Sequence, residues 1–416
     1  MQNNTPYQVC LIANEAYFAY ATTLMKNFVA FHRHPVRFVI LHNVEETNKA
    51  AFESVTKEFI DYKQVEINFH YIDGQDLVHL GMMPSNSRKP TNFRLLIPQL
   101  GYTGRMLYLD VDIMVTQPIN ELFTDPNILQ GNAVGGVVDI ITFKEKYSDY
   151  NYFSQEKYPE DFYAAQFGKN GNYYINAGVL LLDLDKLKEP QENGLNIWQN
   201  GIKKYFTGEL PWLDQTFVNL VHAKAITYLP VKYNYFLNVL YEQRYYSHAD
   251  GWHKSKNLKV GKQNGLLKAP YYPSIVHCLS QDHRKQWNYP DKEIKELFTY
   301  WKNTPLSTLV SRDVQYYTNM MHNFWHQYNF ATSLLDYVDM PNNYEKVELE
   351  QVTKALETQK PWTYNPLFIN PYMYPPQGKR AEIVLQNFVH PRKKWRYSRL
   401  NYYFHHKKLD KLANKK

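Results

Sequence analysis

The sequence predicts an α/β fold: a mostly parallel central sheet with helices on both faces. Three observations favour this class. Short apolar runs alternate with amphipathic segments over residues 7–73, in the β-α-β-α-β order of a parallel sheet. The run at 105–109 is apolar on both faces, as expected of a central strand. Polar residues directly follow such runs, and α/β folds bind ligands at the carboxyl ends of their strands.

The first half of the sheet follows from local periodicity. Residues 7–13 and 36–43 are apolar runs that predict buried strands, and 65–73 alternates in the manner of a third strand. Apolar positions at helical spacing predict helices over 15–31 and 46–60.

The pattern continues through the middle of the chain. Pro90 opens a predicted helix over 90–100, since proline is favoured at the first helical position. Residues 175–187 run from a strand into the start of a helix. The other expected elements are strands at 105–115 and 133–139, a helix over 210–221, strands at 225–235 and 274–279 that close the sheet, and a helix over 291–303.

The character of the chain changes near residue 305. We predict a core over 1–305, an appendage over 306–390 in which prolines and tyrosines cluster, and a basic aromatic tail over 391–416. From residue 392 onward there are ten lysines and arginines against one acid, a balance of +9, whereas the whole chain carries +7. The remainder is therefore close to −2, and the basicity belongs to the tail.

Composition excludes several classes of protein. Cys10 and Cys278 are far apart and imply no disulfide framework, which favours a reducing compartment. The sequence shows neither a secretory signal nor an apolar run of membrane-spanning length. The 36 tyrosines fit sugar or base stacking, but a bias toward AT-rich codons is the favoured explanation.

Two like charges, Asp110 and Asp112, end the apolar run in RMLYLDVDIMV, residues 105–115. Side chains at i and i+2 of a strand point the same way. Two adjacent carboxylates raise each other's pKa unless a cation lies between them, and Mn²⁺ or Mg²⁺ suits such oxygen ligands. A solvated pair at a strand end is the alternative. A phosphatase of the haloacid dehalogenase type is disfavoured because Met114 replaces that family's Thr or Val.

Together with six further motifs, this pattern resembles glycosyltransferase family 8, the retaining galactosyl- and glucosyltransferases with a GT-A, Rossmann-like fold. Bacterial enzymes of the lipopolysaccharide outer core are nearest in character. The motifs follow the family's order over roughly residues 5–305. They are LIANEAY (11–17), TNFRLL (91–96), RMLYLDVDIMV (105–115), GGVVD (135–139), INAGVLLLDL (175–184), LDQTFVN (213–219) and VHCLSQDHRKQW (276–287).

The resemblance implies an Mn²⁺-dependent hexosyltransferase that uses a UDP-sugar, with Mg²⁺ as the alternative ion. It implies that Asp110, Asp112 and His277 bind the metal. A satisfied core histidine is the alternative for His277. The donor-binding residues that it implies are Ala13, Asn14, Tyr17, Arg94, Asp110, Val111, Asp112, Asn176, Ala177 and Lys285.

The resemblance assigns the catalytic side to Gln215, Asp139 and Asp214. Asp139, Asn176 and Asp214 match groups that bond sugar hydroxyls, and Gln215 matches the residue beneath the anomeric carbon. An amide is a poor nucleophile, so we favour front-side attack, with Gln215 stabilising the developing positive charge. The departing UDP, held by the metal and Lys285, would take the acceptor's proton. A covalent intermediate at Asp139 or Gln215 is the alternative.

Several of these positions also have a purely structural interpretation. Tyr17 fits a core aromatic at a helix start as well as a uracil-stacking ring, and Arg94 fits a surface helix arginine. Asn176 fits a buried structural amide. The last motif departs from the family's pattern at Ser280, in the added residues before Lys285, and at Gln286, which replaces a proline; His283 and Arg284 are further cations there.

The tail mixes cations with aromatic rings, which suits an anionic membrane surface. Nucleic acid would be drawn to the same charges, and a solvated tail is the plain alternative. With a sugar-transfer core, we predict a saccharide or glycolipid acceptor and a cytoplasmic, peripheral location on the inner face of the membrane, with no nucleic-acid partner. Two other functions remain open: a non-catalytic glycan- or nucleotide-binding module, and a self-glycosylating enzyme like glycogenin.

Overall fold

The computed structural model of the protein forms two compact units. One comprises residues 1–287 and 298–318, and the other residues 288–297 and 319–416. The structure describes residues 5–139, 174–206, 210, 213–223, 225–237, 273–278, 285–287 and 292–325. The predicted tail lies outside these residues, as does the predicted appendage beyond 325, so the domain limits at 305 and 390 stay a prediction.

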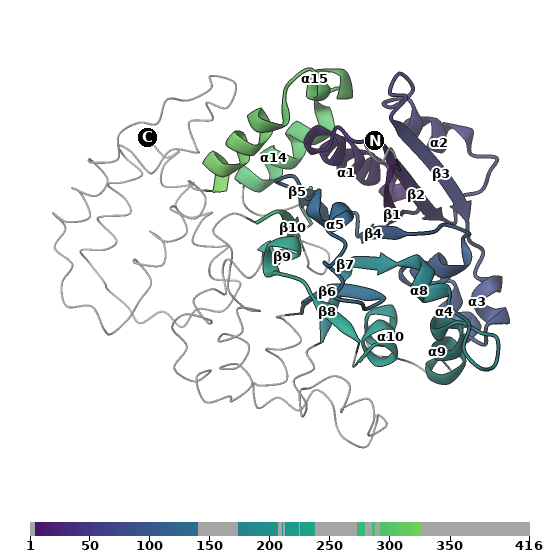
Figure 1. The fold of residues 1–416 in the computed structure, drawn as a ribbon. Coiled ribbons are helices and arrows are strands. Elements are labelled where there is room, and N and C mark those ends of the chain that lie inside the picture. Colours follow the sequence, from purple (N-terminus) through teal and green to yellow (C-terminus); the bar gives the residue numbers. More distant parts are fainter. Residues whose placement is uncertain are drawn as a thin grey trace, which may run out of the picture. The chain divides into compact units, whose positions relative to one another are not determined.

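A seven-stranded sheet forms the centre of the first unit, in the order β3-β2-β1-β4-β7-β6-β8 (Figure 1). Neighbouring strands are parallel except at β7, which is antiparallel to both β4 and β6. The predicted mostly parallel sheet is thereby confirmed. The strands are β1 Tyr7–Ile12, β2 Val36–His42, β3 Val65–Tyr71, β4 Arg105–Leu109, β6 Val134–Val138, β7 Ile175–Asp183 and β8 Ile226–Tyr228.

A second, three-stranded sheet begins where the chain leaves the central one. In it, β5 (Ile113–Val115) pairs antiparallel with β10 (Ile275–His277), and β10 pairs in parallel with β9 (Tyr235–Phe236). The prediction of one continuous strand over 105–115 is therefore wrong, because the backbone turns after Leu109 and β5 joins another sheet. The prediction that 274–279 closes the central sheet is wrong for the same reason.

Helices cover both faces of the central sheet (Figure 1). On one face lie α1 (Glu15–Phe31) and α2 (Lys49–Thr56), and α15 (Leu306–Val310) packs against α1. Alternate residues of β2 reach the two layers. Phe38 meets Phe28 of α1 edge to face, with ring centroids 5.8 Å apart, whereas Val39 belongs to the apolar cluster on the opposite face.

On the opposite face, the 3₁₀ helix η1 (Pro90–Gln99) packs against β1 and β2. The helix predicted over 90–100 is present, as a 3₁₀ helix. Pro98 stands inside it, donates no backbone hydrogen bond and disfavours α-helical geometry. The remaining helices are α3 Gln75–His79, α4 Pro84–Ser87, α5 Glu121–Thr124, α8 Leu184–Lys188, α9 Ile197–Tyr205, α10 Leu213–Val221, α14 Lys292–Asn303 and the 3₁₀ turn η2 Val231–Tyr233. Within the described part of the chain, no helix has the length and apolarity needed to cross a membrane.

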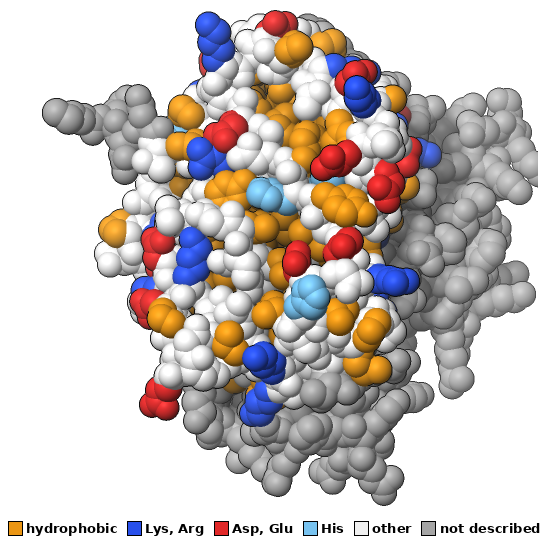
Figure 2. All heavy atoms as spheres, turned by 90° about the vertical axis from the view of Figure 1, so that its right-hand side faces the viewer, with side chains coloured by type: hydrophobic (Ala, Val, Ile, Leu, Met, Phe, Trp, Pro, Cys, Tyr) orange, Lys and Arg blue, Asp and Glu red, His pale blue; other side chains and the backbone are white. Residues whose placement is uncertain are grey.

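The strand β3 forms one edge of the central sheet, and Figure 2 shows the face beside it. Acidic and basic side chains are interspersed with hydrophobic ones over this face. Arg37 on β2 donates from Nε to a carboxylate oxygen of Glu66 on β3 at 2.8 Å. Charged side chains on an edge strand oppose pairing with the edge of another chain.

Gly201→Ala is predicted to destabilise the fold. A Cβ atom on Gly201, in α9, would lie 2.4 Å from Val221 Cγ2 and 2.9 Å from Phe217 Cε2, both on α10. Overpacking of this kind costs about 1–3 kcal/mol, whereas the same substitution in an exposed helix stabilises by about 1 kcal/mol. Urea denaturation should therefore show a lower free energy of unfolding. Lys203→Ala, on the exposed face of α9, is the control, and a stabilised Gly201→Ala protein would contradict the close packing.

Candidate metal centre and its polar network

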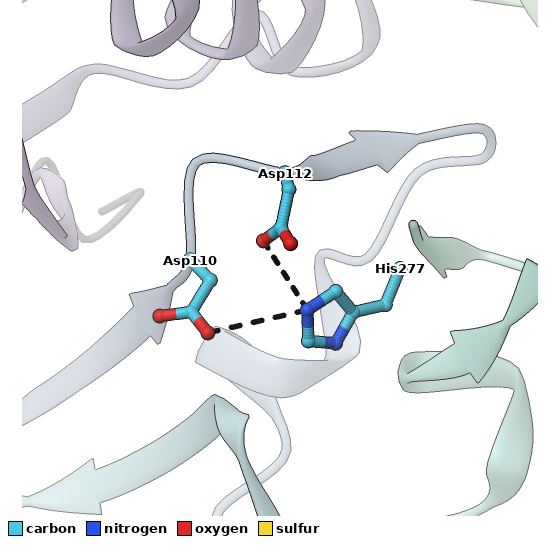
Figure 3. A group of neighbouring side chains, drawn as sticks. All are labelled: Asp110, Asp112 and His277. Atoms are coloured by element: carbon cyan, nitrogen blue, oxygen red, sulfur yellow. Dashed lines mark ion pairs between the residues drawn. The ribbon is translucent and has the colours of Figure 1, made fainter. Parts of the chain in front are cut away.

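Three potential metal ligands meet at the end of β4 (Figure 3). Asp110 directly follows β4, Asp112 lies in the turn before β5, and His277 is the last residue of β10. One ligand atom from each side chain lies within 4.8 Å of the others. The structure thus brings together the three residues predicted from the sequence to hold a metal.

Backbone contacts hold this turn in place. The Asp110 N–H donates to Gly178 O at 2.8 Å, and the Cys278 N–H donates to Asp112 O at 2.9 Å. A Cβ atom on Gly178 would lie 2.3 Å from His277 Cε1 and 2.9 Å from Asp110 Oδ2. The space between the ligands therefore requires glycine at this position of β7.

The imidazole of His277 fits a metal ligand better than a satisfied core residue. It is fully buried, and its Nε2 lies 3.2 Å from Asp112 Oδ1 and 4.0 Å from Asp110 Oδ2. Among the described residues, Nε2 has no hydrogen-bond partner. A buried nitrogen that faces two carboxylates without a hydrogen bond is unfavourable unless a cation lies between them. This donor set, two carboxylates and one imidazole, suits a divalent cation such as Mn²⁺.

Asp112 is held in its ionised form. Burial acts to raise the pKa of Asp112, but the net shift is downward, and the adjacent Lys285 ammonium contributes to it. The Lys285 ammonium contacts Asp112 Oδ2. Burial acts to lower the pKa of Lys285, and the adjacent Asp112 more than offsets this, so the pKa is raised. At neutral pH the pair is therefore a carboxylate facing an ammonium, with the carboxylate deprotonated as metal binding requires.

Arg94, on η1, connects Asp110 to α10. Its Nη2 lies 3.1 Å from Asp110 Oδ1, its Nε lies 3.0 Å from Asp214 Oδ2, and its Nη1 donates to Ala177 O. The side chain is 4% exposed, so the interpretation as a surface arginine is wrong. The guanidinium carbon lies 4.2 Å from the centre of the Tyr108 ring. The predicted contact of Arg94 with a ligand stays a prediction.

Tyr108 is a contributor to the site that the sequence motifs did not identify. Its Oη donates to Asp110 Oδ1 at 2.6 Å. Burial raises the pKa of Tyr108 well above its usual value, so the hydroxyl stays protonated and remains a donor. The signal was available in the sequence, since Tyr108 stands two residues before Asp110 and i, i+2 side chains share one face of a strand.

A second polar group surrounds the start of β7. Asn176 Nδ2 donates to Gln215 Oε1 at 2.9 Å and lies 3.3 Å from Asp139 Oδ2. Gln215 Nε2 donates to Asp139 Oδ2 at 3.0 Å, and the Ala177 N–H donates to Gln215 Oε1 at 3.1 Å. Asp214 precedes Gln215 on α10 and joins this group to Arg94. The residues predicted for the catalytic side therefore lie together.

The start of α1 provides the third part of the site. Asn14 is the N-cap of α1, and its Oδ1 accepts from the Tyr17 N–H at 3.2 Å. Ala13 before it is buried. The half-buried Tyr17 ring meets Trp287 edge to face, with centroids 5.8 Å apart. Trp287 in turn stacks on Tyr20, with centroids 3.7 Å apart and planes 4° apart, which fixes the segment that carries Lys285.

Gln286 ties this segment to the aspartate turn. It is buried, and its Nε2 donates to Val111 O at 3.1 Å, between the two aspartates. The departure from proline at this position thus supplies a contact that proline lacks. Ser280, His283 and Arg284 lie outside the described residues.

Comparisons with known proteins agree with one another. The family model described as Glycosyl transferase family 8 matches residues 8–263. Glycosyltransferase GlyF of Streptococcus pneumoniae serotype 4 is 24% identical over 341 residues, which cover 81% of this chain and 67% of that protein. The structure of the active-site mutant Q189E of LgtC has a TM-score of 0.51 and 20% identity, and covers 71% of this chain and 94% of its own. The bifunctional glycosyltransferase WbbM has a TM-score of 0.51 and 17% identity, and covers 75% of this chain and 52% of its own. At these identities, the solved structures show a shared fold.

Gly178→Ala is predicted to weaken the binding of Mn²⁺ by at least about tenfold, because the added methyl group would displace His277 from the carboxylates. Isothermal titration of the protein with Mn²⁺ measures this. Gly135→Ala in β6 is the matched control, since its Cβ would meet only leucine side-chain atoms away from the cluster. Equal affinities in the two variants would show that the ion binds elsewhere.

The free energy of unfolding of the protein should depend on pH through the titration of Asp214. Burial raises the pKa of Asp214 to about 6, partly offset by Arg94, against an ordinary value of 3.8. Because the folded-state pKa is the higher one, the carboxylate costs no stability below pH 4, and the cost grows as the pH rises to about 6. At about 1.4 kcal/mol per pH unit, this cost reaches about 3 kcal/mol. The free energy of unfolding of Asp214→Asn minus that of the parent should therefore rise by about 3 kcal/mol from pH 4 to pH 7. A difference that does not vary with pH would mean that folding does not raise the pKa of Asp214.

Proposed function

The chain belongs to glycosyl transferase family 8 and has the GT-A fold, and from this premise we propose that it transfers galactose or glucose from a UDP-sugar to a saccharide acceptor, with retention of anomeric configuration. One observation carries the proposal. The buried Nε2 of His277 faces Asp110 and Asp112 at 3.2–4.0 Å without a hydrogen bond from any described residue. These three side chains would hold Mn²⁺, or alternatively Mg²⁺.

The metal centre explains how a nucleoside diphosphate could depart. A bound divalent ion neutralises charge on a diphosphate leaving group. Lys285 adds a second cation at the same place, since its ammonium contacts Asp112 and its side chain is 23% exposed. A lysine acts there as a point charge that can turn toward a phosphate oxygen. Asp110 is 28% exposed, so the carboxylate is open on the side where a donor would approach.

The amide group of Gln215 supports front-side attack. Its Oε1 already accepts hydrogen bonds from the Ala177 N–H and from Asn176 Nδ2, which leaves less electron density for attack on a sugar. One oxygen of Asp139 is engaged in the same way, by Gln215 and Asn176. Gln215 is therefore poorly prepared as a nucleophile. Gln215 would instead stabilise the positive charge that develops on the sugar, while the acceptor's proton passes to the departing UDP.

The donor-binding roles expected from the sequence motifs complete the proposal. Asp139, Asn176 and Asp214 would bond hydroxyl groups of the donor sugar, and Arg94 would support Asp110 from behind. The remaining donor contacts would come from Ala13, Asn14, Tyr17, Val111 and Ala177. The half-buried ring of Tyr17, beside Trp287, offers a face on which uracil could stack.

The acceptor side and the location rest on the sequence. A lipopolysaccharide or another surface glycan is the proposed acceptor, and the basic aromatic tail over 391–416 would hold the protein at the anionic inner face of the membrane. In this arrangement the core over 1–305 binds the donor, and the appendage over 306–390 lies between the core and the tail in the chain. The proposed location is cytoplasmic and peripheral, without a nucleic-acid partner.

Asp110→Asn and Asp112→Asn should each lower the rate of Mn²⁺-dependent UDP release by at least about a thousandfold, because the metal contributes several kcal/mol to departure of the diphosphate. A coupled assay for UDP, run with UDP-galactose and with UDP-glucose, measures the rate and identifies the donor. Glu66→Gln on the edge strand β3 is the matched control, since it removes a carboxylate far from the site without altering the metal centre.

Three outcomes would redirect this proposal. Normal turnover in either aspartate variant would refute the metal centre. Tight UDP binding without any release of UDP from either sugar would favour a non-catalytic binding module. Hexose increments in the intact mass of the protein, without added acceptor, would favour a self-glycosylating enzyme.

A further inference from the structure

We propose that Asn234 is a positioning residue. It fixes the metal-binding tautomer of His277 and joins the metal centre to the hydrogen-bonded side chains of Asn176 and Gln215. The inference rests on the proposed metal centre and concerns a residue outside every sequence motif of the site. Asn234 lies between η2 and β9 and is 1% exposed.

Asn234 bridges two residues of the site. Its Oδ1 lies 3.0 Å from His277 Nδ1, and its Nδ2 donates to Asn176 Oδ1 at 2.9 Å. A buried amide that makes hydrogen bonds through both ends is fixed in orientation, because rotation by 180° would place like groups opposite one another.

The orientation of Asn176 is set independently by the backbone. The Gly178 N–H, which can only donate, lies 2.9 Å from Asn176 Oδ1. At the other end, Asn176 Nδ2 donates to Gln215 Oε1 at 2.9 Å. The oxygen of Asn176 therefore faces Asn234, so Asn234 presents its NH₂ group to Asn176 and its carbonyl oxygen to His277.

The tautomer of His277 follows from this order. A carbonyl oxygen accepts and cannot donate, so His277 Nδ1 must carry the proton. In a neutral imidazole the other nitrogen, Nε2, then holds a free lone pair. That lone pair faces Asp110 and Asp112, which is the state that a metal ligand requires.

The four side chains form one continuous row from Gln215 through Asn176 and Asn234 to His277. Every hydrogen bond in the row points in a set direction, since reversing one amide leaves two donors or two acceptors in contact at each of its ends. The metal centre and the catalytic amide are therefore oriented by the same hydrogen bonds, although they lie on different elements of the fold.

Substitutions of Asn234 test this role in the full-length protein, with Mn²⁺ alone as the probe. Asn234→Leu removes the acceptor, and the dissociation constant for Mn²⁺ should rise by about 10- to 100-fold. Asn234→Asp keeps an acceptor for the Nδ1 proton, so the variant should bind Mn²⁺ much more tightly than Asn234→Leu. Asn196→Ala is the matched control: Asn196 is a buried asparagine that caps α9, and its loss should lower stability but leave Mn²⁺ affinity unchanged.

Long-range ¹H–¹⁵N spectra of the metal-free parent protein provide a readout that requires no variant to fold. They should show His277 protonated at Nδ1, with the signals assigned by comparison with His277→Gln. An Nδ1 without a proton in the parent would overturn the proposal, as would unchanged Mn²⁺ affinity in a folded Asn234→Leu protein. If His277→Gln bound Mn²⁺ as tightly as the parent, the metal centre itself would fail, and the role of Asn234 would fail with it.

Discussion

The repulsion between two carboxylates placed side by side at a strand end is the constraint around which the site is built. Each carboxylate has its own set of partners. Asp110 receives Arg94 and Tyr108 from within the fold, and Asp112 receives Lys285 from a distant segment. The imidazole of His277 lies between them and contributes a lone pair rather than a proton. A cation between the three side chains would complete this arrangement, because it would offset the negative charge of the two carboxylates.

The two carboxylates also differ in how firmly they are held. Asp110 is fixed on the side that faces the protein interior, by a guanidinium and a hydroxyl that cannot leave. Asp112 is paired with a lysine on a flexible stem, and such an ammonium can turn toward a phosphate oxygen. Asp110 thus has permanent partners, whereas the ammonium group that neutralises Asp112 can exchange to another anion.

Sequence reasoning succeeded where the signal was local and failed where it was not. The strands and helices up to residue 73 were predictable because each shows its own periodicity, and the three metal ligands were identified by family resemblance. The break after Leu109 was missed, because apolar residues continue at 113–115 into a strand of another sheet. The contact of Asn234 with His277 joins residues 43 positions apart and has no local signature.

The direction of β7 has a consequence for how this chain can vary. Because β7 runs against β4, its first residues lie beside the last residues of β4, with Val179 opposite Leu109. Asn176, Ala177 and Gly178 consequently reach the site in a fixed register. Inserting or deleting a single residue between Ile175 and Asp183 would turn Gly178 away from the metal ligands and bring a side chain among them. Length changes in homologous chains should therefore be confined to the segments flanking this strand.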